Sequence, residues 1–148
     1  MATGSFAVGV FQPKIEANIG SLYRSAYLYN AAFIFTVGRR YTQQASDTPK
    51  TSRHIPLFHF TDIDDLRAHL PLDWPLVSVE LDERSINLNS FSHPRNVCYL
   101  LGAEDRGLPQ TVLDASHAIV QIPTPKPQSM NVASAGAVLL YDRQLKGL

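Results

Sequence analysis

An apolar run that ends in a charged loop between two glycines constrains the fold of this chain more than any other stretch. The run covers 97–101 and is typical of a strand buried on both faces of a parallel sheet. Gly102 ends it, three charged residues follow, and Gly107 precedes Pro109, whose fixed φ suits the first position of a helix. We therefore predict a strand, a loop and a helix over 110–115. A ligand-binding loop and a plain solvated connection fit this segment equally well.

The rest of the chain alternates between short apolar runs and segments of helical spacing. We predict strands over 6–11, 32–37, 57–60, 76–81, 97–101 and 117–122. We predict helices that start at Asn18, over 62–70 with Thr61 as the cap, over 110–115, and from the cap Asn131 to about 144. Strands that alternate with helices indicate an α/β fold with a mostly parallel sheet flanked by helices.

Composition indicates one ordinary globular domain over 1–148. Of the 148 residues, 45% are hydrophobic and 18% are charged. The sequence has neither an apolar run of membrane-spanning length nor a secretory leader pattern, so we expect no membrane partner and a cytoplasmic location. The single cysteine, Cys98, falls within a predicted strand and is interpreted as a core residue. The five histidines lack the spacing of metal ligands, so we predict no metal site.

Basic residues are concentrated in the first part of a chain whose net charge is zero. Residues 1–60 hold six basic and two acidic residues, a net charge of +4, and the remainder is correspondingly acidic. The polar stretch 38–55 is too long for a tight connector. We predict RNA contacts from its basic residues, although a flexible solvated loop fits it as well: Arg39, Arg40, Lys50 and Arg53.

The segment after the first predicted strand combines a helix cap with an arginine. We interpret Asn18 as the N-cap, followed by a core-facing stripe of Ile19, Leu22, Tyr23 and Ala26. Arg24 lies off that stripe, four residues after Gly20, so its side chain is expected to lean toward the helix start. A helix amino terminus attracts anions, and Arg24 would complete a phosphate clamp there. A solvent-facing arginine is the commoner explanation of such a residue.

The end of the chain predicts a stiff loop before a closely packed helix. Three prolines within 123–130 exclude a helix there. Small residues fill 132–137, and glycine and alanine in a helix permit close backbone approach. The dinucleotide-binding Gly-x-Gly-x-x-Gly motif and the Walker motif are both absent from the sequence.

Three segments together resemble the SpoU class of the SPOUT superfamily, the 2′-O-ribose RNA methyltransferases. The first is 18–24, with asparagine, glycine and arginine at that family's spacing. The second is 101–109, Leu-Gly-Ala-Glu-Asp-Arg-Gly-Leu-Pro. The third joins Ile122-Pro123 to 129–133, Ser-Met-Asn-Val-Ala. The resemblance covers nearly the whole chain, in the family's order.

This resemblance implies a fold and a cofactor that residue patterns alone would not suggest. The family threads its carboxyl-terminal segment into a trefoil knot, which is nearly absent from other folds. It binds S-adenosylmethionine at the knot, largely through backbone groups. The implied cofactor-binding residues are Val79, Glu80, Leu101, Gly102, Gly107, Ile122 and Ser129. Homodimers with RNA reached by both chains are also implied.

The resemblance assigns catalysis to Arg24. Either it acts as the base for the ribose 2′-hydroxyl, which is unusual for so basic a group, or it orients the hydroxyl and stabilises developing charge. Asn18 and Glu104 would position it, with Ser129 and Asn131 completing the site. The alternatives are a catalytically inactive RNA-binding module of the same fold and a small-molecule enzyme of another chemistry. For the latter we find no nucleophile and base in the sequence.

Overall fold

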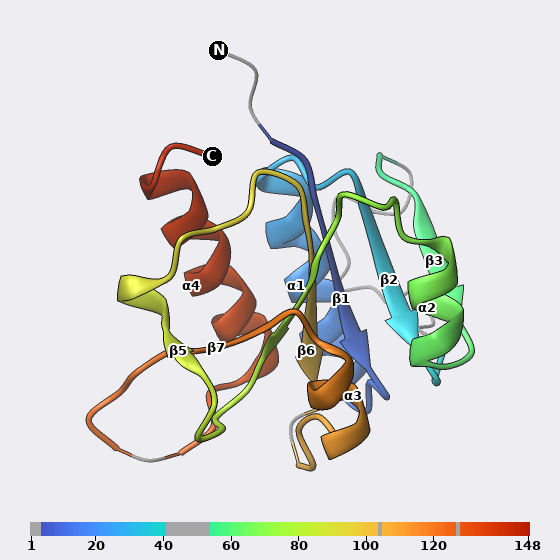
Figure 1. The fold of residues 1–148 in the computed structure, drawn as a ribbon. Coiled ribbons are helices and arrows are strands. Elements are labelled where there is room, and N and C mark those ends of the chain that lie inside the picture. Colours follow the sequence, from blue (N-terminus) through green and yellow to red (C-terminus); the bar gives the residue numbers. More distant parts are fainter. Residues whose placement is uncertain (1–3, 41–53, 104, 127) are drawn as a thin grey trace.

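The computed structural model describes residues 4–40, 54–103, 105–126 and 128–148, and these residues form one seven-stranded parallel sheet (Figure 1). Its strand order is β3-β2-β1-β6-β4-β7-β5, and every strand pair is parallel. The strands are β1 (Phe6–Phe11), β2 (Phe33–Val37), β3 (Leu57–Phe60), β4 (Leu76–Val79), β5 (Ile86–Asn87), β6 (Val97–Gly102) and β7 (Ala118–Gln121). The predicted fold class, an α/β fold with a mostly parallel sheet, is confirmed.

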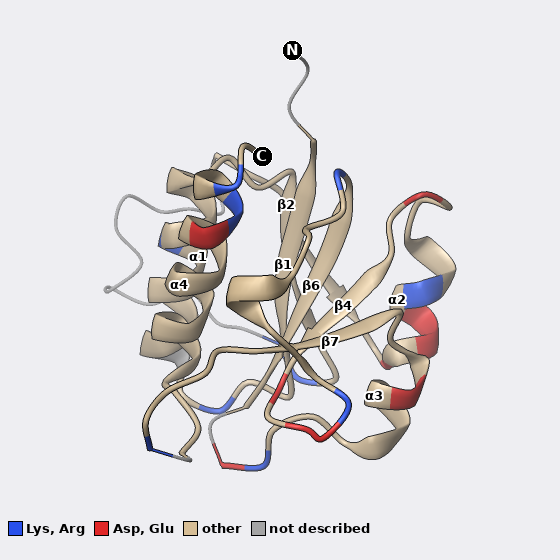
Figure 2. Cartoon of the chain, turned by 60° about the vertical axis from the view of Figure 1, so that its left-hand side comes forward, with Lys and Arg blue, Asp and Glu red and all other residues tan. Residues whose placement is uncertain are grey.

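Helices cover both faces of this sheet. Figures 1 and 2 show α1 (Glu16–Leu28) and α4 (Val132–Leu145) side by side on one face. The shorter helices α2 (Ile63–His69) and α3 (Gln110–Ala115) lie on the other. Because all the strands are parallel, their carboxyl ends meet at one edge of the sheet, the lower edge in both figures.

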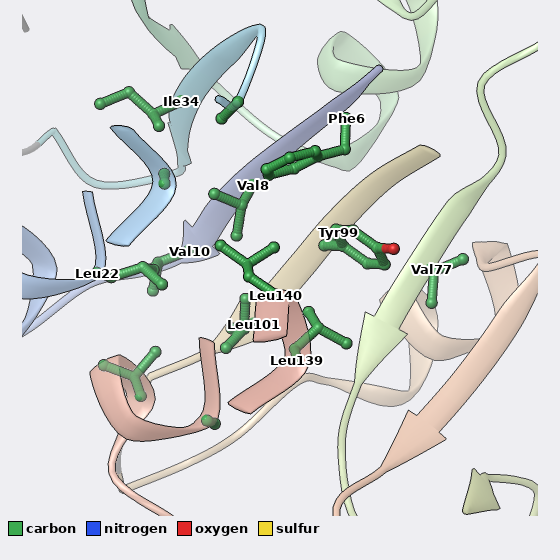
Figure 3. Close-up of a cluster of buried hydrophobic side chains, with 14 of the residues drawn as sticks. Phe6, Val8, Val10, Leu22, Ile34, Val77, Tyr99, Leu101, Leu139 and Leu140 are labelled. Carbon is green, nitrogen blue, oxygen red and sulfur yellow. The ribbon is translucent and has the colours of Figure 1, made fainter. Parts of the chain in front are cut away.

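Strand β6 connects the two halves of the core. Its Tyr99 and Leu101 pack under α1 and α4, among the side chains shown in Figure 3. The intervening Cys98 and Leu100 belong to the core under α2 and α3. Alternate residues of a strand point to opposite faces, so burial on both faces requires the continuous apolar run from which this strand was predicted. Cys98 is a core residue as predicted, and burial raises the pKa of its thiol.

Three predicted strands are shorter in the structure, among them the strand predicted over 32–37, which is β2, Phe33–Val37. The prediction 76–81 was wrong at its end, because β4 stops at Val79 and Glu80 then bonds its own successor through its side chain. The strand predicted over 117–122 is β7, Ala118–Gln121. Neither β5 nor the 3₁₀ turn at Leu88–Ser90 was predicted, because both are too short to show a hydrophobic period.

The predicted caps of two helices were wrong, and a third residue, expected at the first position of a helix, is a cap instead. Helix α1 begins at Glu16 with Ile15 at the N-cap, so Asn18 lies within the first turn. Good helix formers at positions 16 and 17 extend the helix beyond the asparagine. Asp62, rather than Thr61, caps α2, where its side chain accepts the N–H of Asp65. Pro109 has an extended ψ of 158° and is the N-cap of α3 instead of its first residue. Asn131 caps α4 as predicted.

None of the helices in the described part of the chain is both long enough and apolar enough to span a membrane.

Candidate functional site

A pocket lies where β4, β6 and β7 end and the chain leads into α4. It encloses about 560 Å³ including its open mouth. Its lining residues are Val79, Glu80, Leu81, Leu101, Gly102, Ala103, Gly107, Gln121, Ile122, Gln128, Ser129, Met130, Val132 and Ala135. The seven predicted cofactor-binding residues are all in this set, so the structure brings them together around one pocket. Their role toward a cofactor remains a prediction.

Glu80 fixes two strand ends at this pocket. One carboxylate oxygen accepts the N–H of Leu81 at 2.9 Å, and the other accepts the N–H of Leu108 at 2.7 Å. The side chain thereby ties the end of β4 to the loop after β6. Glu80 was among the predicted cofactor-binding residues, but its two hydrogen bonds to backbone N–H groups were not predicted from the sequence.

Gly102 and Gly107 allow the loop after β6 to fold back on itself. A Cβ on Gly102 would lie 2.5 Å from the carbonyl carbon of Gly107, so backbone occupies the space a side chain would need. Gly107 has a φ of +64°, and a Cβ there would lie 2.2 Å from a carboxylate oxygen of Glu80. Both positions therefore require glycine for the pocket to keep this shape.

Asn131 and Ser129 stand at the start of α4 with different functions in the structure. The side-chain oxygen of Asn131 accepts the N–H groups of Ala133 and Ser134 at 3.0 and 3.2 Å. Asn131 therefore caps the helix and does not line the pocket. Ser129 is exposed at the pocket. The structure thus brings only Ser129 of the predicted catalytic residues to the pocket, among those that it describes.

A second opening, which we call the β1–β6 cleft, lies on the other side of the loop after β6. It shares Ala103 and Gly107 with the pocket and encloses about 920 Å³ including its mouth. It is lined by Phe11, Gln12, Lys14, Arg39, Ala103, Asp105, Arg106, Gly107 and Pro109. Lys14 Nζ lies 2.6 Å from the Asp105 carboxylate, and that hydrogen bond lowers the pKa of Asp105. Lys14, Asp105 and Arg106 were not predicted as site residues, because only the fold brings their loops together.

Arg24 lies apart from both openings within one chain. It is exposed on α1, and neither Arg24 nor Asn18 lines the pocket or the cleft. The helix begins at Glu16, about two turns before Arg24, so the predicted phosphate clamp at the helix start was wrong.

Of the four predicted RNA-binding residues, the structure describes Arg39 and Arg40, and these two have different surroundings. Arg39 lines the β1–β6 cleft. Arg40 is exposed and does not line the cleft. Burial lowers the pKa of His59 in β3, and the charge of Arg40 lowers it further. Lys50, Arg53 and the predicted catalytic residue Glu104 lie outside the described residues. Within the described ranges, no group of three or more His, Cys, Asp or Glu side chains could hold a metal ion.

Comparison with known sequences finds one matching family over most of the chain. A model of the SpoU rRNA methylase family matches residues 5–141. The tRNA (guanosine(18)-2′-O)-methyltransferase of Escherichia coli K12 is 25% identical over 131 residues. That match covers 86% of this chain and 57% of the relative, so the chain spans little more than half the length of this relative.

Solved structures share the fold. The AdoMet-bound rRNA methyltransferase of Sinorhizobium meliloti has a TM-score of 0.86 at 23% identity, over 99% of this chain and 58% of the other. A structure reported for the 2-OH methylation of C/U34 on tRNA has a TM-score of 0.82 at 24% identity, over 98% of this chain and 99% of the other. At these identities the likeness establishes the fold alone.

Proposed function

Because the chain belongs to the SpoU rRNA methylase family, we propose that it transfers a methyl group from S-adenosylmethionine to a ribose 2′-hydroxyl of RNA. The observation that carries the proposal is the pocket at the ends of β4, β6 and β7, in a chain of this family. A relative and a structural neighbour are both named for tRNA, which makes tRNA the first substrate to test and rRNA the second. RNA as the substrate also supports a cytoplasmic location.

The pocket is chemically suited to S-adenosylmethionine. Apolar side chains, among them Leu101, Ile122 and Met130, offer contact area to the adenine ring. Among the described lining residues, Glu80 carries the one formal charge, and a carboxylate complements a sulfonium cation. The ends of β4, β6 and β7 also bring backbone groups to the lining of this pocket. When bound, the cofactor supplies a methyl group that its sulfonium sulfur already activates.

The remaining requirement is to align the ribose hydroxyl and to help it lose its proton. We assign that role to Arg24, whose guanidinium can bind a phosphate or the developing alkoxide with several N–H donors. Stabilising charge that develops only in the transition state raises turnover without changing cofactor affinity. Asn18, Glu104, Ser129 and Asn131 are proposed to position Arg24 and the substrate, as in the family that the sequence resembles.

Arg24 is not among the residues that line the pocket of its own chain, which supports a homodimer as the active form. The outer face of α1 and α4 exposes large apolar side chains, with Leu28 67% exposed, Val138 40%, Tyr141 53% and Leu145 70%. The last three are spaced three and four residues apart on α4 and therefore share one side of the helix. Arg24 lies one turn before Leu28. We propose that two copies pair through this face and that each supplies Arg24 to the site of its partner.

We also propose the trefoil knot of the family for the carboxyl-terminal segment. The chain after β7 packs back against α1, where a Cβ on Gly136 would lie 2.1 Å from a methyl carbon of Leu22. The end of α4 is held by the segment before β6, because Lys146 donates to the carbonyls of Leu88 and Phe91. Tracing the path of 80–148 in an experimental structure tests the knot.

The test of the proposed function is a map of ribose methylation in cells with and without the gene. The proposal expects at least one 2′-O-methyl site in tRNA or rRNA to disappear on deletion. The site should return with the wild-type gene and fail to return with Arg24→Ala. Unchanged maps, together with RNA binding by the purified protein, would establish the inactive RNA-binding alternative.

A further inference from the structure

We propose that the β1–β6 cleft binds the RNA phosphodiester next to the target ribose, with Arg39 and Arg106 as its anion-binding residues. The inference rests on the proposed function and extends it, because the pocket accounts for the methyl donor only. The lining of this cleft shares Ala103 and Gly107 with the pocket, so a nucleotide bound there would lie beside the donor.

The topology of the sheet creates this cleft. Strand β1 pairs with β2 on one side and with β6 on the other, so the order of the strands along the chain reverses at β1. Phe11 is in register with both Val37 and Gly102. The loops after the three strands therefore leave the sheet at the same level. Open α/β sheets bind ligands in the crevice at such a switch point.

The lining of the cleft suits one nucleotide with its phosphate. Phe11, Ala103 and Pro109 provide apolar contact, and Gln12 adds a side-chain amide. Gln12 has a φ of +51° and Gly38 one of +85°. A Cβ on Gly38 would lie 2.3 Å from the amide nitrogen of Gln12, so the two loops are in contact directly before Arg39.

The charges of the cleft leave two arginines available to an anion. The carboxylate of Asp105 is engaged by Lys14 at 2.6 Å. Arg39 and Arg106 are exposed, and neither forms an ion pair with any residue in the described part of the chain. Figure 2 shows charged loops gathered below the strand ends, where this cleft lies. Arginine binds phosphate oxygens with paired N–H donors, and RNA supplies such oxygens beside every ribose.

The experiment compares Arg39→Gln and Arg106→Gln with Arg67→Gln, which replaces an exposed arginine on α2. The affinity of fluorescein-labelled unmodified tRNA is measured against salt concentration. Each cleft variant should bind about tenfold more weakly, since a hydrogen bond to a charged group is lost. The log–log salt slope should fall by about 0.7 to 0.9 per lost contact. Arg67→Gln should match the wild type, and S-adenosylmethionine should bind all three variants equally.

A fourth variant gives an effect of opposite sign, which misfolding cannot produce. Asp105→Asn removes a negative charge and frees Lys14, so tRNA should bind more tightly and with a steeper salt slope. Unchanged or weaker binding by this variant would contradict the inference. Weaker binding of inorganic phosphate by the two arginine variants without weaker binding of tRNA would also overturn it, because the site would then take free anions.

The outcomes for the inference and for the proposed function can be told apart. A wild-type protein that methylates RNA, with cleft variants equal to Arg67→Gln in binding and transfer, would overturn the cleft and leave the function standing. The reverse result is weaker tRNA binding by the cleft variants with no methyl transfer by the wild type. That result would support the cleft as an RNA site and overturn the methyltransferase activity.

Discussion

The Glu80 carboxylate accepts two backbone N–H groups, from Leu81 and Leu108, and so holds one wall of the pocket. Glu80→Gln keeps one oxygen acceptor but turns an amide N–H₂ toward a backbone donor. We expect S-adenosylmethionine affinity to fall about tenfold, because one backbone N–H that now donates to a carboxylate loses its acceptor. Calorimetry checks this, with Glu83→Gln as the control for an exposed acid three residues away. Equal affinities of the two variants would contradict the account.

Substitution of Arg24 tests the proposed methyl-transfer step rather than the binding of S-adenosylmethionine. Arg24→Ala should lower methyl transfer by about a hundredfold or more, the scale expected when a group that stabilises the transition state is lost. Donor affinity should not change, because the role proposed for Arg24 is toward the ribose hydroxyl and its phosphate and not toward S-adenosylmethionine. Single-turnover rates and calorimetry separate the two effects, with Arg67→Ala as the control. Near-normal turnover by Arg24→Ala would show that Arg24 is a surface arginine without a role in methyl transfer.

At the residue scale, the resemblance to the SpoU class named residues that the structure brings to one pocket, whereas nothing in the sequence indicated the cleft. Lys14 and Asp105 are 91 residues apart, and only strand pairing brings them to 2.6 Å. No pattern within a short stretch of sequence could have indicated that these two residues are in contact.

The end of α4 is fixed to the rest of the protein by a buried polar network. The ring of His93 bonds the Tyr99 hydroxyl at 2.6 Å and the Asp142 carboxylate at 2.8 Å. Arg143, 2% exposed, donates to the backbone carbonyls of Pro94 and Arg95. Burial raises the pKa of Tyr99 to about 12, so its hydroxyl stays protonated. These bonds anchor the helix whose first turn lines the pocket.

Burial lowers the pKa of His93 below its ordinary 6.5, although Asp142 opposes the shift. Below about pH 6.5 the unfolded chain therefore binds a proton that the native state does not, and the free energy of unfolding should fall as pH falls. Asp142 remains charged over this range, since its pKa lies below 3.8. Urea unfolding of wild type and His93→Gln between pH 7.5 and about 5.5 checks this. The stability advantage of the wild type should shrink toward the acid end, and a constant difference would contradict it.

The start of α4 could be predicted from the sequence, whereas the starts of α1 and α2 were predicted with the wrong caps, although the Asp62 side chain caps α2. Asn131 caps α4 with its own oxygen, so that start was predictable. Helix α1 has no side-chain cap. Its start is set by backbone hydrogen bonds from Asn18 and Ile19 to the carbonyl of Ile15, and such bonds cannot be predicted from residue type.

At the scale of the whole molecule, the proposed homodimer depends on the exposed apolar side chains on the outer face of α1 and α4. Tyr141→Glu puts a charge at the centre of the outer face of α1 and α4 and should yield a monomer by sedimentation velocity. That monomer should bind S-adenosylmethionine normally, because the pocket lies within one chain, and should transfer methyl groups poorly. Leu72→Glu, on an exposed loop, is the control. A wild-type monomer that methylates RNA would reject the shared site.

The most direct measurement of the central claim is the position of the transferred methyl group. The purified protein is incubated with methyl-labelled S-adenosylmethionine and unmodified tRNA or rRNA, and the RNA is then hydrolysed in alkali. A 2′-O-methyl group blocks attack on the adjacent phosphodiester, so the account predicts label in alkali-resistant dinucleotides. Label in mononucleotides would indicate methylated bases, and either that result or the absence of label from both RNAs would contradict the account.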